Sequence, residues 1–468
     1  MSQLKRKDIQ GVLLSAYGHL PWSANVLLRI DDRARAQAWL GSLADTVTTA
    51  IGKEDRSGTN VAITYPGLVK LGFEEAPGVF PIAFVEGMAS ARRSKILCDT
   101  GASAPDAWTW GTGANAVDIL LLLFAHEEAA LQMALSLHER AFDAAGLCEV
   151  AALRGHRHHD GKEQFGFSDG IAQPAIRGER SSEPARRRTD HTNDVAAGEF
   201  ILGYRNEYGY PSESPIVDGA TDPSGLLSAA RPEKRDFGRN GSYLVLRQLE
   251  QDVAKFWRFL DQATSGPSGS DAAARESLAA KFIGRWPSGA PLVKAPHKDD
   301  RSIANDNCFG FAADLEGTRC PVGAHIRRAN PRDGFANDSP KESLHRSNKH
   351  RILRRGRSYG PRIENVLVDD GAERGLHFIA LNSDIERQFE FVHQTWLNNS
   401  TFCGLSNEVD PLVGAQPAGG VMSIQKHPVR KRYKGLERFV TTKGGSYFFL
   451  PSLRALRYLA ALAPSPQR

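Results

Sequence analysis

Two stretches of the chain repeat one pattern of apolar and polar positions. Each begins with a run of apolar and β-branched residues and continues with apolar residues three or four positions apart. The stretches are NVLLRIDDRARAQAWLGSL, residues 25–43, and YLVLRQLEQDVAKFWRFL, residues 243–260. The apolar run predicts a strand, and the wider spacing predicts an amphipathic helix. When the stretches are superposed, Trp39 falls on Trp257, which indicates that the chain is a duplication.

A second pair of stretches supports the duplication and occurs in the same order. Residues 117–142 and 375–399 each run from an apolar strand, through an acidic helix start, into a long helix with an apolar stripe. A strand and a helix, repeated twice in each half, predict two α+β domains with antiparallel sheets and helices on one face. We expect residues 176–200 and 263–276, which are rich in charge, Ser, Pro or Gly, to be flexible surface loops. The arginines at 186–188 are an anion patch or, as we prefer, part of a solvated loop.

Length and composition narrow the class of protein. The 468 residues exceed the usual size of a single core, and 41% apolar with 24% charged residues is typical of a globular chain. A net charge of +5, with acids interleaved among the bases, argues against nucleic acid as a partner. Five widely spaced cysteines without a C-x-x-C pair argue against a disulfide framework or a zinc knuckle.

The targeting signals in the sequence are few. The first twenty residues place basic residues ahead of a short apolar stretch, but Gly11 and His19 interrupt it and no small-x-small cleavage site follows. No window approaches the length of a membrane span. We therefore expect a cytoplasmic protein without a membrane partner.

His325 is the first candidate for chemistry, in the stretch RCPVGAHIRRANPRD, residues 319–333. A neutral imidazole is a good metal ligand, whereas fixed positive charge is a poor setting for a metal cation. The four surrounding arginines are Arg319, Arg327, Arg328 and Arg332. One interpretation is that they meet acidic groups of the cofactor that carries the metal. The alternative is a histidine at the edge of a core, paired with backbone or a carboxylate.

Asp169 and Arg354 are two further candidates for chemistry, and each also has an ordinary structural explanation. FGFSDGIAQP, residues 165–174, holds Asp169 between glycines, either as an ordinary turn or as a carboxylate on a loop that a planar cofactor can approach closely. Arg354 lies on a short apolar strand before a glycine turn, where a surface salt bridge is the alternative.

Three apolar and acidic positions complete the candidate set. Leu376 and Phe378 share one side of a predicted strand, which is usually core. Asp410 precedes a proline, as in many turns. GHRHHD, residues 155–160, favours a solvated histidine-rich strand end over a zinc site, since no second ligand group lies at finger spacing.

Taken together in this order, these segments resemble the dye-decolorising peroxidases, a family of haem b enzymes. The family's G-x-x-D-G motif matches residues 166–170, and its distal L-x-F matches residues 376–378. Its proximal histidine segment is similar to CPVGAHIRRANPRD, and its distal arginine segment to HRILRRGRSYG. The similarity covers most of the chain and fits the longer intracellular bacterial subclass best. The sequence departs from the family at His377 and in the basic loop near residues 180–195.

The resemblance implies a fold of two ferredoxin-like α+β domains, with antiparallel sheets and flanking helices and with the haem in the C-terminal one. We place the domains at residues 1–215, which carry the GxxDG loop, and 216–468. It also implies one haem b per chain and an activity that reduces hydrogen peroxide while dyes, phenols or other small aromatic reductants are oxidised through a ferryl intermediate. The expected oligomeric state is a monomer or a dimer.

The resemblance further implies a role for each candidate residue. His325 is the axial iron ligand, and Asp410 is the candidate partner of its other ring nitrogen. Asp169 and Arg354 are the catalytic proton carrier and the stabiliser of developing charge. The expected cofactor contacts are His325, Arg328, Leu376, Phe378 and Asp410.

Two other functions compete with the peroxidase. A haem-binding or iron-releasing protein would use the same fold and axial histidine, but it would not need Asp169 and Arg354. A basic module that binds nucleic acid or anions through residues 186–188 would carry no haem.

Overall fold

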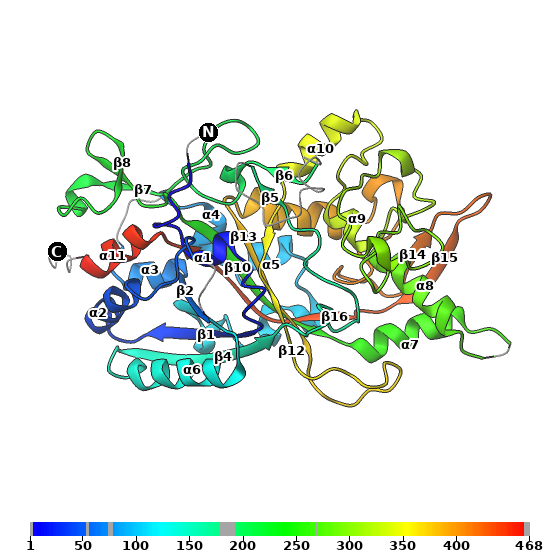
Figure 1. Ribbon diagram of the computed structural model, residues 1–468, viewed down its shortest axis with the longest axis horizontal. Helices are drawn as coiled ribbons and strands as arrows, with labels where there is room; N and C mark the ends of the chain where they lie inside the picture. Colours follow the sequence, from blue (N-terminus) through cyan, green and yellow to red (C-terminus); the bar gives the residue numbers. More distant parts are fainter. Residues whose placement is uncertain (1–2, 53–55, 74–77, 178–191, 268, 463–468) are drawn as a thin grey trace.

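The central sheet is built from two four-stranded antiparallel units (Figure 1). This computed structural model describes residues 3–52, 56–73, 78–177, 192–267 and 269–462. The first unit contains β1 (Trp22–Ile30), β2 (Ser57–Ile63), β3 (Ile119–Ala125) and β4 (Leu147–His156), in the order β4-β1-β3-β2. The second contains β10 (Ser242–Gln251), β12 (Arg357–Tyr359), β13 (Gly375–Asn382) and β16 (Val440–Leu450), in the order β16-β10-β13-β12. Both orders read fourth, first, third, second along the chain, which is the ferredoxin-like arrangement.

The predicted strand and helix pairs occupy equivalent places in the two units. Residues 25–43 form β1 and α2 (Arg33–Ala44), and residues 243–260 form β10 and α7 (Val253–Thr264). Residues 117–142 form β3 and α6 (Glu128–Phe142). Residues 375–399 form β13 and a helix wound more widely than an α-helix, in segments η9 (Glu386–Glu390) and η10 (Val392–Leu397). The predicted fold class and duplication are confirmed.

β3 shows why its sequence is apolar at every position. Ile119, Leu121 and Leu123 face one core with the helices of the first unit, whereas Leu120 and Leu122 face a second core. That second core also contains side chains of β10, β13 and β16, so it lies between the two units. A strand covered on both faces reads as a continuous apolar run.

Single residue pairs join the two units at both edges. Ile63 of β2 pairs with Phe449 of β16, and His156 of β4 pairs with Ser358 of β12. β11 (Leu353–Arg354) also pairs with β13. The last helix, α11 (Leu453–Ala461), returns to the first unit, where the Gln37 amide donates to the carbonyl of Leu459 over 3.3 Å. The boundary between residues 215 and 216 stays a prediction.

A further group of elements packs on the second unit at the right of Figure 1. α7, α8 (Ala272–Ile283) and the hairpin of β14 (Gly420–Ile424) and β15 (Lys431–Leu436) share a core with Phe165, Phe167 and Leu412. This core positions the loops that carry the site. The other short elements are α1 (Gly11–Leu14), α3 (Tyr65–Lys70), α4 (Ile82–Glu86), α5 (Ala91–Ile96), α9 (His325–Ala329), α10 (Pro340–Asn348), β5 (Ala175–Ile176), β6 (Asp194–Val195), β7 (Ile216–Asp218), β8 (Ser228–Arg231) and β9 (Lys234–Asp236).

The predicted loops have different outcomes. Residues 263–276 are partly helical, contrary to the expectation of a flexible insertion, because Asp271 caps α8 by accepting from the backbone N–H groups of Ala273 and Ala274. The arginines at 186–188 lie outside the described residues. Among the described helices, none is long and apolar enough to cross a membrane.

Candidate active site

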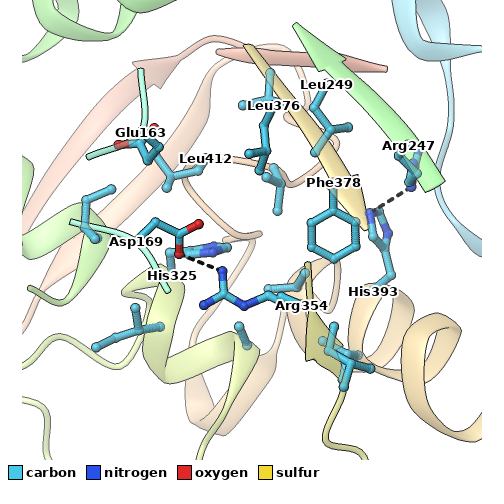
Figure 2. Close-up of a pocket in the computed structure, with 18 of the residues that line it drawn as sticks. Glu163, Asp169, Arg247, Leu249, His325, Arg354, Leu376, Phe378, His393 and Leu412 are labelled. Carbon is cyan, nitrogen blue, oxygen red and sulfur yellow. Dashed lines mark hydrogen bonds and ion pairs between the residues drawn. The ribbon is translucent and has the colours of Figure 1, made fainter. Parts of the chain in front are cut away.

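One cavity of about 290 Å³ brings the predicted site residues together. It lies between β10 and β13 of the second unit, the start of α9 and the loop that follows β4 (Figure 2). His325, Asp169, Arg354, Leu376 and Phe378 all line it, although they come from four separate segments. The volume is near the lower end of the range for small-molecule sites.

His325 and Asp410 form the hydrogen bond expected from the sequence. His325 is the first residue of α9, and its Nδ1 lies 3.0 Å from Oδ2 of Asp410. The other oxygen of Asp410 accepts from the N–H groups of Leu412 and Val413, at 3.0 and 2.9 Å. Because the carboxylate can only accept, Nδ1 carries the proton and the lone pair of Nε2 is left for a ligand.

The pKa values of the pair show that Asp410 is the ionised acceptor. Burial alone would raise the pKa of Asp410, but the neighbouring His325 and the N–H of Val413 hold it below its usual value. Burial alone would lower the pKa of His325, but the Asp410 carboxylate outweighs burial and raises it. Asp410 is therefore a buried, ionised acceptor that fixes the orientation of the imidazole.

The GxxDG loop exposes Asp169 through its two glycines. Gly166 and Gly170 have φ of 95° and 82°, a region that favours glycine. The Glu163 carboxylate closes the loop by accepting from the N–H groups of Phe165 and Phe167, at 2.9 and 3.0 Å. The Asp169 side chain is consequently held at the cavity with 39% of its surface exposed.

Asp169 and Arg354 meet across the cavity wall (Figure 2). Nη1 of Arg354 donates to Oδ1 of Asp169 over 2.8 Å, and the backbone N–H of Arg354 donates to the Gln173 side chain over 3.0 Å. Burial alone would raise the pKa of Asp169, but Arg354 and the N–H of Gly170 lower it overall. Asp169 is thus ionised at mildly acid pH, with a cation beside it.

Leu376 and Phe378 project from β13 into the cavity, as the alternation along a strand requires (Figure 2). His377, between them, points to the other face, where its ring stacks on Tyr359 with centroids 4.7 Å apart. The departure from the family at His377 therefore does not alter the cavity wall.

Arg328 does not occupy the place predicted for it. Its side chain is fully buried, does not line the cavity, and donates to the backbone carbonyls of Trp396, Asn399 and Glu408. Arg327 is bound to Asp314 at 3.2 Å. The expectation that Arg327 and Arg328 face a cofactor is wrong, because neither side chain lines the cavity.

Other residues of the cavity were not singled out from the sequence. Nη1 of Arg247 lies 3.3 Å from Nε2 of His393, and Arg247 also contacts Asp99. Burial lowers the pKa of His393 to about 3, so this imidazole is neutral. The one available signal was Arg247 itself, a charged residue directly after the apolar run of residues 243–246.

The histidine cluster does not line this cavity. Nε2 of His156 is 3.0 Å from Nδ1 of His158 at the end of β4. In the described part of the chain, no group of three or more His, Cys, Asp or Glu residues is placed to hold a metal ion.

A smaller cavity of about 170 Å³ adjoins the first. Glu163, Asp169, Arg354 and Leu376 line both cavities. The Asp169–Arg354 pair therefore lies on the wall of both cavities.

Comparison with known proteins gives a consistent result. No family model matches the chain. Dye-decolorizing peroxidase msp1 of Mycetinis scorodonius is 30% identical over 463 residues, which cover 92% of this chain and 82% of the relative. This relative is fungal, and the predicted bacterial subclass stays a prediction.

Solved structures agree with the sequence match. An ancestral D-type dye-decolorizing peroxidase has a TM-score of 0.79 at 28% identity, over 97% of this chain and 99% of that one. A dye-decolorizing peroxidase in complex with 2,6-dimethoxyphenol has a TM-score of 0.78 at 25% identity, over 98% of this chain and 100% of that one. Since sequence and fold both match over nearly the whole length, this chain belongs to the dye-decolorizing peroxidases, a family of haem enzymes.

Proposed function

We propose that this chain reduces hydrogen peroxide to water and oxidises small aromatic donors, with a haem b whose iron Nε2 of His325 would bind. The observation that carries the proposal is the meeting of two pairs at one cavity, His325 with Asp410 and Asp169 with Arg354. A haem carrier would need the first pair only. A proton carrier beside a fixed cation is what heterolytic cleavage of peroxide requires.

The residues at the cavity fit a haem. Leu249, Leu376, Phe378, Leu412 and Val413 offer the apolar surface that a porphyrin needs. His325 offers a ring nitrogen with its proton held on the other side. Haem b fits better than a covalently attached haem, because the sequence contains no C-x-x-C-H motif. We propose one haem per chain.

Asp169 and Arg354 would have different roles in the reaction with peroxide. When bound, the haem supplies the oxidising equivalents that peroxide delivers and that two one-electron donors remove. The ionised Oδ atoms of Asp169 take a proton from one peroxide oxygen and return it to the other. Arg354, which stays charged, stabilises the negative charge that grows on the departing oxygen.

The smaller cavity offers a route by which peroxide reaches Asp169. It shares Asp169 and Arg354 with the main cavity, so a small polar molecule that enters it meets both groups. Leu376 and Phe378 narrow the interior and would keep larger donors out. Dyes and phenols are proposed as donors because the relatives are named for dye oxidation and one related structure contains 2,6-dimethoxyphenol.

An absorption spectrum tests this function. The purified protein should show a Soret band, and one equivalent of hydrogen peroxide should change it at once. Adding 2,6-dimethoxyphenol should then restore the resting spectrum. A Soret band that peroxide leaves unchanged would favour a haem carrier, and the lack of any haem would exclude both functions.

Arg354→Leu should leave haem binding intact but slow the reaction with peroxide about 100- to 1,000-fold, because one preorganised charge is lost. Stopped-flow absorption at the Soret band measures this rate. Arg362→Leu is the matched control, since Arg362 pairs with Asp160 at 2.9 Å with 32% and 38% exposure, against 30% and 39% for Arg354 and Asp169. Equal rates in the two variants would remove Arg354 from the mechanism.

Dye oxidation should be fastest in acid, at about pH 4 to 5. Asp169 acts as a base only when ionised, and its lowered pKa keeps it ionised below the ordinary value of 3.8. Reduction of the oxidised haem consumes protons, which favours acid over neutral solution. A pH–rate profile with its maximum above neutrality would contradict this.

The same profile isolates the contribution of Arg354. Without its charge, the pKa of Asp169 should rise, so the acid limb of the profile should move to higher pH in Arg354→Leu. An acid limb at an unchanged pH would show that another group sets it.

We propose the cytoplasm as the compartment. All five cysteines are free, as expected in a reducing environment.

A further inference from the structure

The cavity wall carries more positively charged than negatively charged residues. Five arginines and three carboxylic acids line the cavity: Arg247, Arg285, Arg351, Arg354, Arg438, Asp99, Glu163 and Asp169. Arg354 is paired with Asp169, and Arg247 with Asp99. Arg438 is half-buried and interacts electrostatically with Asp99.

Arg285 and Arg351 have no such partner. Their exposed fractions are 4% and 5%, and in the described part of the chain no carboxylate lies within ion-pair distance of either. Arg285 donates to the backbone carbonyls of Gly289 and Asp306, at 2.7 and 2.8 Å. Arg351 donates to the carbonyl of Ala172 over 3.2 Å. Burial lowers the pKa of each guanidinium to about 10.

A chain of hydrogen bonds connects the two arginines. Nη2 of Arg285 donates to Oδ1 of Asn307, and the carbonyl of Asn307 accepts from the Asn193 amide over 3.0 Å. Oδ1 of Asn193 in turn accepts from Nη1 of Arg351 at 3.5 Å. The two asparagines therefore bridge both arginines.

Asn330 adds an unused polar group to the cavity wall. It follows α9 directly, five residues after His325. Its amide nitrogen and its amide oxygen are both buried and, within the described ranges, have no hydrogen-bond partner. A buried amide without partners is costly, as is a buried cation without an anion. A bound molecule with acidic oxygens would balance the two cations and accept a hydrogen bond from Nδ2 of Asn330, which removes most of both costs.

We propose that Arg285 and Arg351 bind the two carboxylates of the haem, with Asn330 as a further polar group on the same cavity wall. The inference rests on the proposed function and adds to it the orientation of the cofactor. It gives Arg285 and Arg351 the role that the sequence had suggested for Arg328. Arg247 is not part of this anchor, because Asp99 already balances its charge.

Titration of the apo-protein with two porphyrins tests the anchor. The probes are haem, which has two free carboxylates, and haem dimethyl ester, in which both are neutral. The parent should bind haem more tightly than the ester. Arg285→Met and Arg351→Met should each weaken haem binding roughly 10- to 100-fold, the range expected for a lost charged hydrogen bond. Their affinity for the ester should stay within a few-fold of the parent's.

Arg355→Met is the matched control. Arg355 is 7% exposed and donates to the backbone carbonyls of Val12 and Leu13, at 2.7 and 3.0 Å, but it does not line the main cavity. This variant should keep the parent's preference for haem over the ester. The ratio of two affinities within one variant also separates a lost anchor from a general loss of the cavity. Arg285→Lys and Arg351→Lys, which keep the charge, should retain part of the preference.

The outcomes separate this inference from the proposed function. A preference that persists in Arg285→Met and Arg351→Met, or that is lost in Arg247→Met instead, overturns the anchor. A parent that binds both porphyrins equally well also overturns the anchor but leaves the haem function intact. A parent that binds neither porphyrin overturns both.

Discussion

Replacing His325 with alanine is expected to lower haem affinity by more than about 100-fold and to abolish the normal Soret band. Removing even a residue that only supports a metal ligand costs about 10- to 100-fold, and His325 is proposed as the ligand itself. Peroxide-dependent dye oxidation should fall with it. Haem titration of the apo-protein, followed at the Soret band, gives the affinity directly.

The other histidines of the cavity provide the control for this variant. His350 and His393 also line the cavity, and burial lowers their pKa values to about 4 and about 3, so both are neutral. Both ring nitrogens of His393 are engaged, by Arg247 and by Asn398, and Nδ1 of His350 lies 2.5 Å from the carbonyl of Arg387. His350→Ala should keep the parent's spectrum. If His325→Ala kept it and His350→Ala lost it, the axial role would pass to His350.

Replacing Asp169 with asparagine should lower turnover about 100- to 10,000-fold, the usual contribution of a positioned proton carrier. An amide can accept a hydrogen bond from Arg354 but cannot take the proton of peroxide. Haem content should not change, because Asp169 is not a proposed cofactor ligand. Steady-state dye oxidation at about pH 4 to 5, where the parent is expected to be fastest, is the measurement of choice.

Asp160→Asn is the matched control for Asp169→Asn. Asp160 pairs with Arg362 in a similar geometry and lines neither cavity. Turnover of this variant should stay within a few-fold of the parent's. An Asp169→Asn enzyme with undiminished turnover in acid would show that another group moves the proton.

The repeated units could be predicted from the sequence because the pattern that encodes them is local. Strands and amphipathic helices require apolar residues at periods of two and 3.6, and these periods can be counted along the chain. The order of the strands in each unit then followed from the family resemblance. Asp271 shows the limit, since a stretch of small and polar residues was taken for a loop although this one side chain starts a helix.

The candidate site residues were identifiable from short motifs, whereas the pairing of His325 with Asp410 was suggested only by the family resemblance. His325 and Asp410 are 85 residues apart, and Asp169 and Arg354 are 185 residues apart. Only folding decides which oxygen meets which nitrogen across such separations. The direction of the pKa shift of Asp169 depends on the balance between burial and the charge of Arg354, so the sequence left it open.

The arginines show most clearly what the sequence could determine and what depended on the tertiary structure. The sequence by itself determined that this protein has a duplicated α+β fold and a histidine, an aspartate and an arginine suited to peroxide chemistry. It placed the cationic partners of the cofactor's acidic groups beside His325, at Arg328, because proximity along the chain was the only guide. The tertiary structure instead joins Arg328 to the carbonyls of residues 396–408. It brings Arg285 and Arg351 to the cavity wall, where no carboxylate of the described residues forms an ion pair with them. The charge of a buried guanidinium is balanced by whatever lies around it in space, and no local pattern records those neighbours.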